Sequence, residues 1–318
     1  MRYVFFGTPD FAVATLEHLV SHGMRPEAVV TAVDKPAGRG RKLQASAVKA
    51  YAQEQAIAVM QPRNLKEPSF LEALKGLQAD LFVVVAFRML PEAVWNMPPQ
   101  GTINLHASLL PAYRGAAPIQ WAIIQGETET GVTTFRLKHA IDTGDLLLQR
   151  RTPIHLHEDA GSLYQRLMHL GAHLVLDTIA GLEEGTLEPR PQPPAPSGKE
   201  APKLEQSHMQ IKWEDDALRI HNQIRGLSPR PGAYTSYEHT KVKILESKLV
   251  EGPIPDALCD AAPGAIGWSG KTMYVRCGRG VLAPVRLQIA GKKPMTPPDL
   301  HNGRLLPDGT FHRPDAVI

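Results

Sequence analysis

The feature that most constrains the fold is a proline-rich stretch a little beyond the middle of the 318-residue chain. Residues 186–205 contain six prolines, and proline has a fixed φ angle and no amide hydrogen for a helix or sheet. Such a segment is extended and semi-rigid, and it separates two regions with different sequence patterns. We therefore predict a first domain over residues 1–185, a linker over 186–205 and a second domain over 206–318.

The first region alternates short apolar runs with segments of helical spacing, which is typical of a doubly wound, Rossmann-like α/β fold. Residues 3–6 are predicted to form a strand, and a helix follows from its expected N-cap, Asp10. Residues 28–33 and 81–86 are the next strands, the latter central in a parallel sheet. The turn at Gly7 lacks the other glycines of a dinucleotide-binding G-x-G-x-x-G, so no nicotinamide site is expected.

The second region has a different pattern, in which one helix over residues 216–225 precedes short strands. The strands are expected at residues 233–237, 241–249, 265–268, 273–276 and 281–290. Five short strands indicate a small β-barrel, with an OB-type fold as the natural candidate. Barrels of this kind often bind nucleic acid, although basic residues on such a domain can also be ordinary solvated surface.

One pair of polar residues suggests chemistry. Residues 103–106 are predicted to form a strand in which Asn104 and His106 share one face. Pro111 ends this strand nearby, and open parallel sheets bind ligands at the carboxyl ends of their strands. Asp142 lies in an Asp-Thr-Gly turn that could bring a carboxylate to the imidazole. An amide, a base and a carboxylate suit a reaction through a tetrahedral oxyanion. The same residues could instead cap loop backbone, and spacing alone leaves both interpretations open.

Charge and cysteine content narrow the class of protein. The net charge of +3 and the pI near 8.8 permit a polyanionic partner without requiring one. Cys259 and Cys277 are too few for a disulfide framework or a zinc site, which favours a reducing, cytoplasmic setting. The longest apolar run, residues 81–87, is too short for a membrane span, and no signal peptide is expected. His169 and His173 lack the glutamate of a helical zinc motif, so we expect no metal.

Several runs of residues carry a resemblance to a known family. Asn104-Leu-His106 is followed by Ser108-Leu-Leu-Pro111, by Tyr113-Arg-Gly-Ala-Ala-Pro118 and by Asp142-Thr-Gly-Asp145. Together these runs resemble the signature of the folate-dependent formyltransferases. Two more runs, residues 34–42 and 291–295, narrow the resemblance to the members that act on methionyl-tRNA. The resemblance extends over nearly the whole chain, with the motifs in the expected order.

This resemblance implies a reaction and a set of site residues. It implies transfer of the formyl group of 10-formyltetrahydrofolate, a co-substrate and not a permanently bound cofactor, to the α-amino group of methionine on initiator tRNA. The catalytic residues would be Asn104, His106 and Asp142. The folate-binding positions that it implies are Phe87, Arg88, Leu90, Ser108, Leu109, Leu110, Pro111 and Asp145. Arg88 stands near a glycine of the family pattern, and Arg230 stands where an aromatic residue is expected.

A basic run follows the second predicted strand, and from Lys35 onward no acidic residue occurs before Glu54. Charge alone is compatible with a solvated surface. The resemblance, however, places this loop against the acceptor end of the tRNA. The tRNA-binding residues that it implies are Lys35, Arg39, Arg41 and Lys42. We therefore expect folate and initiator tRNA as partners, no DNA or membrane partner, and a monomer.

Three alternatives share parts of this pattern. An amino-sugar N-formyltransferase would use the same donor and the same three central residues. A folate hydrolase would use water as the nucleophile, and a non-catalytic RNA-binding protein would keep only the scaffold. The basic run around Arg39 argues against a sugar acceptor, and the complete set of Asn104, His106 and Asp142 argues against a purely binding role.

Overall fold

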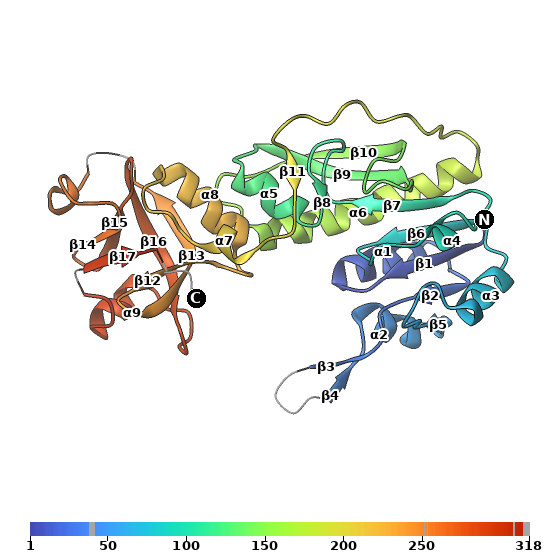
Figure 1. Ribbon diagram of the computed structural model, residues 1–318, viewed down its shortest axis with the longest axis horizontal. Coiled ribbons are helices and arrows are strands. Elements are labelled where there is room, and N and C mark those ends of the chain that lie inside the picture. The colour runs from blue at the N-terminus through green and yellow to red at the C-terminus, as the bar shows by residue number, and fades with distance from the viewer. Residues whose placement is uncertain (38–41, 251, 253, 308, 314–318) are drawn as a thin grey trace. The chain divides into compact units, whose positions relative to one another are not determined.

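The computed structural model describes residues 1–37, 42–250, 252, 254–307 and 309–313. Within this part the chain forms two compact units, whose elements are labelled in Figure 1. The sheet unit comprises Met1–Gly115, Glu129–Pro153 and Tyr164–Glu200, and the barrel unit comprises Ala116–Thr128, Ile154–Leu163 and Ala201–Ile318. The two units are interleaved in the sequence. The predicted domain division at residue 185 and the linker over 186–205 stay predictions.

The described residues of the sheet unit form a seven-stranded sheet in the order β10-β9-β7-β6-β1-β2-β5. Its parallel strands are β1 (Tyr3–Gly7), β2 (Ala28–Val30), β5 (Val59–Met60), β6 (Leu81–Val85) and β7 (Thr102–His106). Antiparallel β9 (Glu129–Arg136) and β10 (Leu146–Pro153) complete one edge. The two-residue strands β8 (Arg114–Gly115) and β11 (Glu200–Ala201) lie outside this sheet. The predicted doubly wound α/β fold is confirmed, although β2 is shorter than the expected 28–33.

The helices of the sheet unit are α1 (Asp10–Ser21), α2 (Ala47–Glu54), α3 (Pro68–Gly76), α4 (Glu92–Trp95) and most of α6 (Ala160–Glu183). Two glycines allow α1 and α6 to lie close to one face of the sheet. A Cβ atom on Gly7 would come within 2.5 Å of Ala12 in α1, and one on Gly171 of α6 within 2.6 Å of Leu105 in β7. Pro9 and not Asp10 occupies the N-cap of α1, so that sequence prediction was wrong.

The opposite face of the sheet carries an apolar cluster and the polar end of β7. Val4, Phe6 and Val84 pack there with side chains of α3 and α4. Asn104 pairs directly with Val84 in the parallel register, so its side chain belongs to this face, as does that of His106 two residues on. The two polar residues therefore share one face at the carboxyl edge of the sheet, as the sequence predicted.

The barrel unit contains a closed antiparallel barrel, which in the described residues has six strands in the order β12-β13-β16-β15-β14-β17. The strands are β12 (Ala233–Tyr237), β13 (Thr240–Leu249), β14 (Ala265–Ser269), β15 (Thr272–Arg276), β16 (Val281–Ile289) and β17 (Gly309–His312). The sequence predicted the first five and missed β17, which closes the barrel by pairing with β12 and β14. Its four residues include one buried apolar side chain, Phe311, which is too weak a pattern to recognise.

The core of the barrel unit is built around two stacked aromatic rings. Trp213 lies parallel to Phe311 with ring centroids 5.6 Å apart, and its indole N–H donates to Thr235 Oγ1 at 3.0 Å. The helices of this unit are α5 (Pro118–Ile124), α7 (Gln206–Met209), α8 (Ala217–Leu227), the short 3₁₀ helix η1 (Asp256–Leu258) and α9 (Pro297–Asn302). A Cβ on Gly226 of α8 would lie 2.6 Å from Ile124 of α5, so this glycine permits close helix packing. No helix of the described residues is long and apolar enough to cross a membrane.

Candidate active site

The centre of the site is the carboxyl end of β7. His106 is buried, with 7% of its surface exposed, whereas Asn104 is partly exposed. Within the described residues the Asn104 amide has no hydrogen-bond partner. An asparagine on a sheet face whose N–H groups are not used by the protein can donate to a bound molecule.

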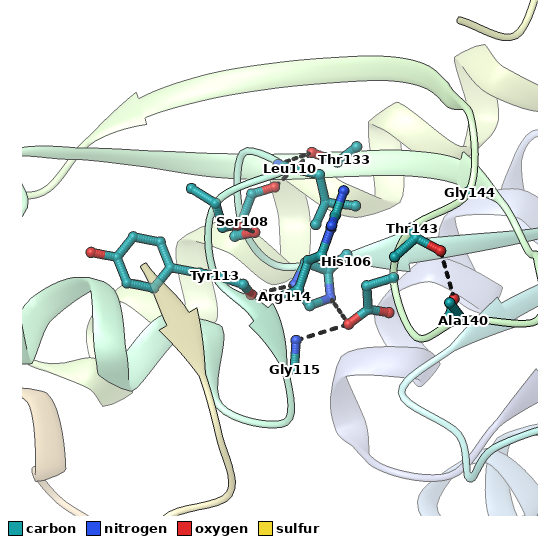
Figure 2. A network of polar contacts seen from close by, with 12 residues as sticks. His106, Ser108, Leu110, Tyr113, Arg114, Gly115, Thr133, Ala140, Thr143 and Gly144 are labelled. Atoms are coloured by element: carbon teal, nitrogen blue, oxygen red, sulfur yellow. Dashed lines mark hydrogen bonds and ion pairs between the residues drawn. The ribbon is translucent and has the colours of Figure 1, made fainter. Parts of the chain in front are cut away.

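Both ring nitrogens of His106 face acceptor oxygens (Figure 2). Nε2 lies 2.8 Å from the Tyr113 carbonyl oxygen, and Nδ1 lies 3.7 Å from Asp142 Oδ2. A carbonyl and a carboxylate can only accept, so hydrogen on either ring nitrogen would point at an acceptor. Nε2 is thus placed to donate to the Tyr113 carbonyl, and Nδ1 faces the Asp142 carboxylate.

Asp142 reaches this ring from the turn that joins β9 to β10. Its backbone has a φ of +52°, a left-handed conformation that is uncommon for a residue other than glycine. Its Oδ2 atom accepts a hydrogen bond of 2.9 Å from the Gly115 amide. The Gln192 side chain donates to the Asp142 carbonyl at 2.9 Å. The predicted trio of Asn104, His106 and Asp142 thus gathers at one edge of the sheet, and its catalytic role stays a prediction.

The loop after β7 contains four predicted folate positions, and side chains of β9 and β10 form hydrogen bonds with its backbone. The four are Ser108, Leu109, Leu110 and Pro111. Thr133 Oγ1 donates to the Ser108 carbonyl at 2.6 Å and accepts from the Leu110 amide at 3.1 Å (Figure 2). Gln149 donates to the Leu110 carbonyl at 2.8 Å. Thr133 and Gln149 were not predicted from the sequence, because each is an ordinary polar residue in a strand and no short motif marks it.

The exit of β6 holds three more predicted folate positions, Phe87, Arg88 and Leu90. Leu90 is buried in the apolar cluster under the sheet, and Phe87 packs edge-on against Phe6 at 5.7 Å between ring centroids. The Arg88 guanidinium donates to the carbonyl oxygens of Pro62, at 2.6 Å, and Arg63, at 3.0 Å. These bonds hold the arginine that stands near the family's glycine. In the described part of the chain no hydrogen bond joins the backbone of residues 87–90 to another group.

Asp145, the last of the predicted folate positions, starts the return from the Asp142 turn. Its carboxylate forms an ion pair of 2.7 Å with Lys138, and its carbonyl accepts from the Arg136 amide at 2.9 Å. This ion pair lies at the surface, since the Lys138 side chain keeps 54% of its surface accessible. A surface ion pair of this kind contributes about 0–1 kcal/mol, so Asp145 could exchange Lys138 for a ligand at small cost.

The basic run forms the arms of a hairpin. Strands β3 (Lys35–Ala37) and β4 (Lys42–Gln44) pair antiparallel and leave the sheet beside α2 (Figure 1). At its base Lys49 pairs with Asp34 at 2.6 Å, and hydrogen bonds from Lys49 and Gln61 lower the pKa of the Asp34 carboxyl. Lys35 is exposed at the start of β3. The predicted tRNA contacts Arg39 and Arg41 lie outside the described residues.

Comparison with known proteins identifies the family. A family model described as "Formyl transferase" matches residues 1–179, and another described as "Formyl transferase, C-terminal domain" matches residues 203–305. The chain belongs to the formyltransferase family. The resemblance inferred from the sequence is therefore confirmed, and the chain is a member of a family of enzymes.

Relatives within the family match the chain over nearly its whole length. The methionyl-tRNA formyltransferase of Porphyromonas gingivalis strain W83 is 45% identical over 312 residues, 95% of each chain. That of Trichlorobacter lovleyi is 44% identical over 318 residues, 99% of this chain and 98% of its own. At this identity and coverage the formyltransferase fold and its two family regions are shared from end to end.

Solved structures of more distant proteins share the fold. An N-formyltransferase from Helicobacter canadensis, solved with folinic acid and dTDP-3-aminofucose, has a TM-score of 0.67 at 21% identity, over 89% of this chain and 98% of its own. HypX from Aquifex aeolicus, solved with tetrahydrofolic acid, has a TM-score of 0.64 at 19% identity, over 94% of this chain but 46% of HypX. These similarities concern the fold alone.

Proposed function

We propose that this formyltransferase moves the formyl group of 10-formyltetrahydrofolate to the α-amino group of methionine on initiator tRNA. The observation that carries the proposal is the arrangement at the end of β7. An Asn104 amide with no hydrogen-bond partner among the described residues stands on the same face as a His106 ring between two acceptor oxygens. The methionyl-tRNA formyltransferases at 44–46% identity over nearly the full chain support the choice of acceptor.

The reaction needs an amine nucleophile and an oxyanion stabiliser. The methionine nitrogen forms a bond to the formyl carbon, whose C=O bond opens to a tetrahedral oxyanion. The Asn104 N–H and the His106 imidazolium stabilise that oxyanion, and removing one such donor typically costs about 10²–10³ in rate. The oxyanion then collapses, the bond to N10 of the folate breaks, and N10 takes up the proton that the amine loses. The products are formylmethionyl-tRNA and tetrahydrofolate.

Asp142 has two tasks in this scheme. Its carboxylate lies 3.7 Å from His106 Nδ1, where it orients the ring and stabilises its positive charge. It also accepts the amine proton, directly or through a water molecule, before that proton passes to N10. Its side chain is mostly buried, with 15% of its surface exposed, so that few waters compete for the proton.

The folate donor fits the exits of β6 and β7. The unpaired backbone N–H and C=O groups of residues 87–90 suit a pterin ring, which offers both donors and acceptors along one edge. Leu90 and Leu110 are buried and give that edge an apolar support. The Ser108–Pro111 loop and Asp145 would bound the same space. As a co-substrate, the folate supplies the formyl carbon and leaves with each turnover.

The acceptor tRNA fits the basic hairpin. A phosphate backbone is bound by lysine and arginine side chains, and four basic residues lie between positions 35 and 42 with no acidic residue among them. They are Lys35, Arg39, Arg41 and Lys42. The neighbouring Lys49, at the base of the hairpin, is already paired with Asp34.

One assay tests the proposal directly. Purified protein is incubated with methionyl initiator tRNA and 10-formyltetrahydrofolate, and formylmethionine released from the tRNA is measured together with tetrahydrofolate. We expect equal amounts of both. Formate without formylmethionine would indicate a folate hydrolase, and transfer to a nucleotide-linked amino sugar but not to tRNA would indicate a sugar enzyme. Binding of tRNA without turnover would overturn the enzymatic assignment.

A further inference from the structure

The proline-rich segment has one residue that behaves unlike the rest. Every residue from 188 to 198 is described, and all of them are exposed except Gln192, which is half-buried. Prolines stand on both sides of it, Pro191 and Pro193, and they restrict the backbone so that little conformational freedom remains to be lost. A long polar side chain held inward from a stiff, exposed segment indicates a specific contact.

The Gln192 amide uses both of its ends. Nε2 donates to the carbonyl oxygens of Asp142, at 2.9 Å, and Gly144, at 2.7 Å. Oε1 accepts from Arg114, at 3.1 Å from Nε and 2.5 Å from a terminal nitrogen. Carbonyls only accept and a guanidinium only donates, so these partners fix which end of the amide faces which. An amide is the side chain that satisfies all of them.

These contacts bear on the geometry of the centre. Asp142 has a left-handed backbone, which costs a non-glycine residue about 1–3 kcal/mol and persists only where surrounding contacts hold it. Gln192 binds the carbonyl of Asp142 itself and that of the second residue beyond. It also binds Arg114, whose neighbour Gly115 donates to Asp142 Oδ2 at 2.9 Å. The Gln192 side chain thus joins the turn that carries the Asp142 carboxylate to strand β8, whose Gly115 amide orients that carboxylate.

We propose that Gln192 is a positioning residue that holds the Asp142 carboxylate beside His106, an inference that rests on the proposed formyl transfer for its effect on rate. The proline-rich segment is then part of the catalytic centre as well as a connection along the chain. A displacement of about 1 Å in a catalytic group can cost on the order of 10² in rate, which sets the scale of the effect.

The first test compares Gln192→Ala and Gln192→Glu with the parent enzyme in formyl transfer to methionyl-tRNA. We expect kcat to fall about 10- to 100-fold in both, with KM for folate and for tRNA unchanged. The glutamate keeps the size and the Arg114 contact but turns an acceptor toward the two carbonyls, so it should not rescue. Arg190→Ala is the matched control, because Arg190 lies in the same segment and bonds to Leu146 through its backbone alone, at 2.7 and 2.8 Å.

A double-mutant cycle tells positioning from general damage. If Gln192 acts through Asp142, Gln192→Ala should lower kcat no more than about twofold further in an Asp142→Asn background. Losses that multiply would overturn the proposal, since they would mean that Gln192 acts independently of the carboxylate.

A measurement without turnover separates this inference from the proposed function. In protein labelled at the histidine Cε1, the His106 signal is assigned by its loss in His106→Gln. It should be displaced in Gln192→Ala in the same direction as in Asp142→Asn, and unchanged in Arg190→Ala. An unchanged His106 signal in Gln192→Ala would refute the positioning role. Absence of formyl transfer in the parent enzyme would instead refute the function and leave this comparison valid.

Discussion

At the scale of single residues, the centre that we propose contains a histidine with little access to water. His106 keeps 7% of its surface exposed and faces the Tyr113 carbonyl and the Asp142 carboxylate. Electrostatic interactions in such a site are weakly screened, so the positive ring that we propose would stabilise a nearby oxyanion more than a solvated ring would.

The first prediction concerns this centre. We expect His106→Ala and Asp142→Asn each to lower kcat by about 10²–10³. The first removes the group proposed to stabilise the oxyanion, and the second removes the carboxylate proposed to orient that ring and to accept the amine proton. Thermal unfolding followed by circular dichroism should show that both variants stay folded at the assay temperature. Arg63→Ala serves as a control, since Arg63 contributes its carbonyl and not its side chain to the Arg88 contact. Turnover near the parent level would remove the mutated residue from the mechanism.

A second residue-scale prediction concerns His221 in the barrel unit. Its ring is buried and shares a hydrogen bond of 2.9 Å with Ser247. Burial is the largest cause that lowers its pKa from 6.5 to about 4, and the charges of Arg225 and His157 lower the pKa further in the same direction. The unfolded chain therefore binds this proton first as the pH falls. The neutral histidine's contribution to the free energy of unfolding is complete above pH 6.5. It is lost as the pH falls toward 4, and the total loss is roughly 3 kcal/mol.

The measurement is the free energy of unfolding in urea between neutral pH and about pH 5. His221→Gln can keep a hydrogen bond to Ser247 but cannot titrate, so its stability should fall less over this range than that of the parent. Parallel pH curves for parent and variant would show that His221 does not contribute to the acid sensitivity.

At the scale of elements, the hairpin of β3 and β4 is distinct from the rest of the sheet unit. Its neighbour Lys49 is paired with Asp34. Within the sequence of the two strands and the loop between them, residues 35–44, there are basic residues and no acidic ones. Leu43 in β4 is 72% exposed, which is unusual for a large apolar side chain and adds a surface that a partner could cover. Both properties suit an element that contacts another macromolecule.

The third prediction tests that element. We expect Arg39→Ala to lower kcat/KM for methionyl-tRNA and to reduce the slope of log affinity against log salt by about one unit, because one phosphate contact is lost. KM for the folate should not change. Lys75→Ala, at the end of α3, is the control for removing a positive charge elsewhere on the sheet unit. An Arg39→Ala enzyme that uses tRNA like the parent at every salt concentration would favour a sugar acceptor instead.

At the scale of the whole molecule, the two compact units exchange segments along the chain. Residues 116–128, which include α5, lie in the barrel unit although the sequence on both sides of them builds the sheet. The contact that fixes α5 there is with α8, where Gly226 lets Ile124 approach. Cutting the chain at residue 185 would therefore leave α5 without α8.

The fourth prediction concerns that cut. We expect a fragment of residues 1–185 to fold and to bind folate, because it contains every strand of the seven-stranded sheet, but to use tRNA poorly. It should melt at a lower temperature than the full chain, since the apolar face of α5 loses its partner. Isothermal titration with a folate and calorimetric melting measure the two effects. A fragment that formylates tRNA as well as the full chain would refute the division of labour between the domains.

The sequence by itself determined several central elements and the face that Asn104 and His106 share. The period of two in residues 103–106 placed Asn104 and His106 together, and the apolar run at 81–86 predicted a central strand; both follow from local geometry. Local patterns also have limits. Asp10 was expected to cap α1, but Pro9 holds that position, and the four-residue β17 was too short to detect.

Only the tertiary structure decided which distant residues meet. Nothing in the sequence of the proline-rich segment indicates that Gln192 binds the Asp142 turn. Nothing near Arg88 in the sequence indicates that its guanidinium donates hydrogen bonds to the carbonyls of Pro62 and Arg63. Such contacts arise because folding must pair each buried donor and acceptor with whichever group the packed elements bring within reach. Periodicity is a property of neighbours along the chain, whereas this pairing is a property of the assembled fold.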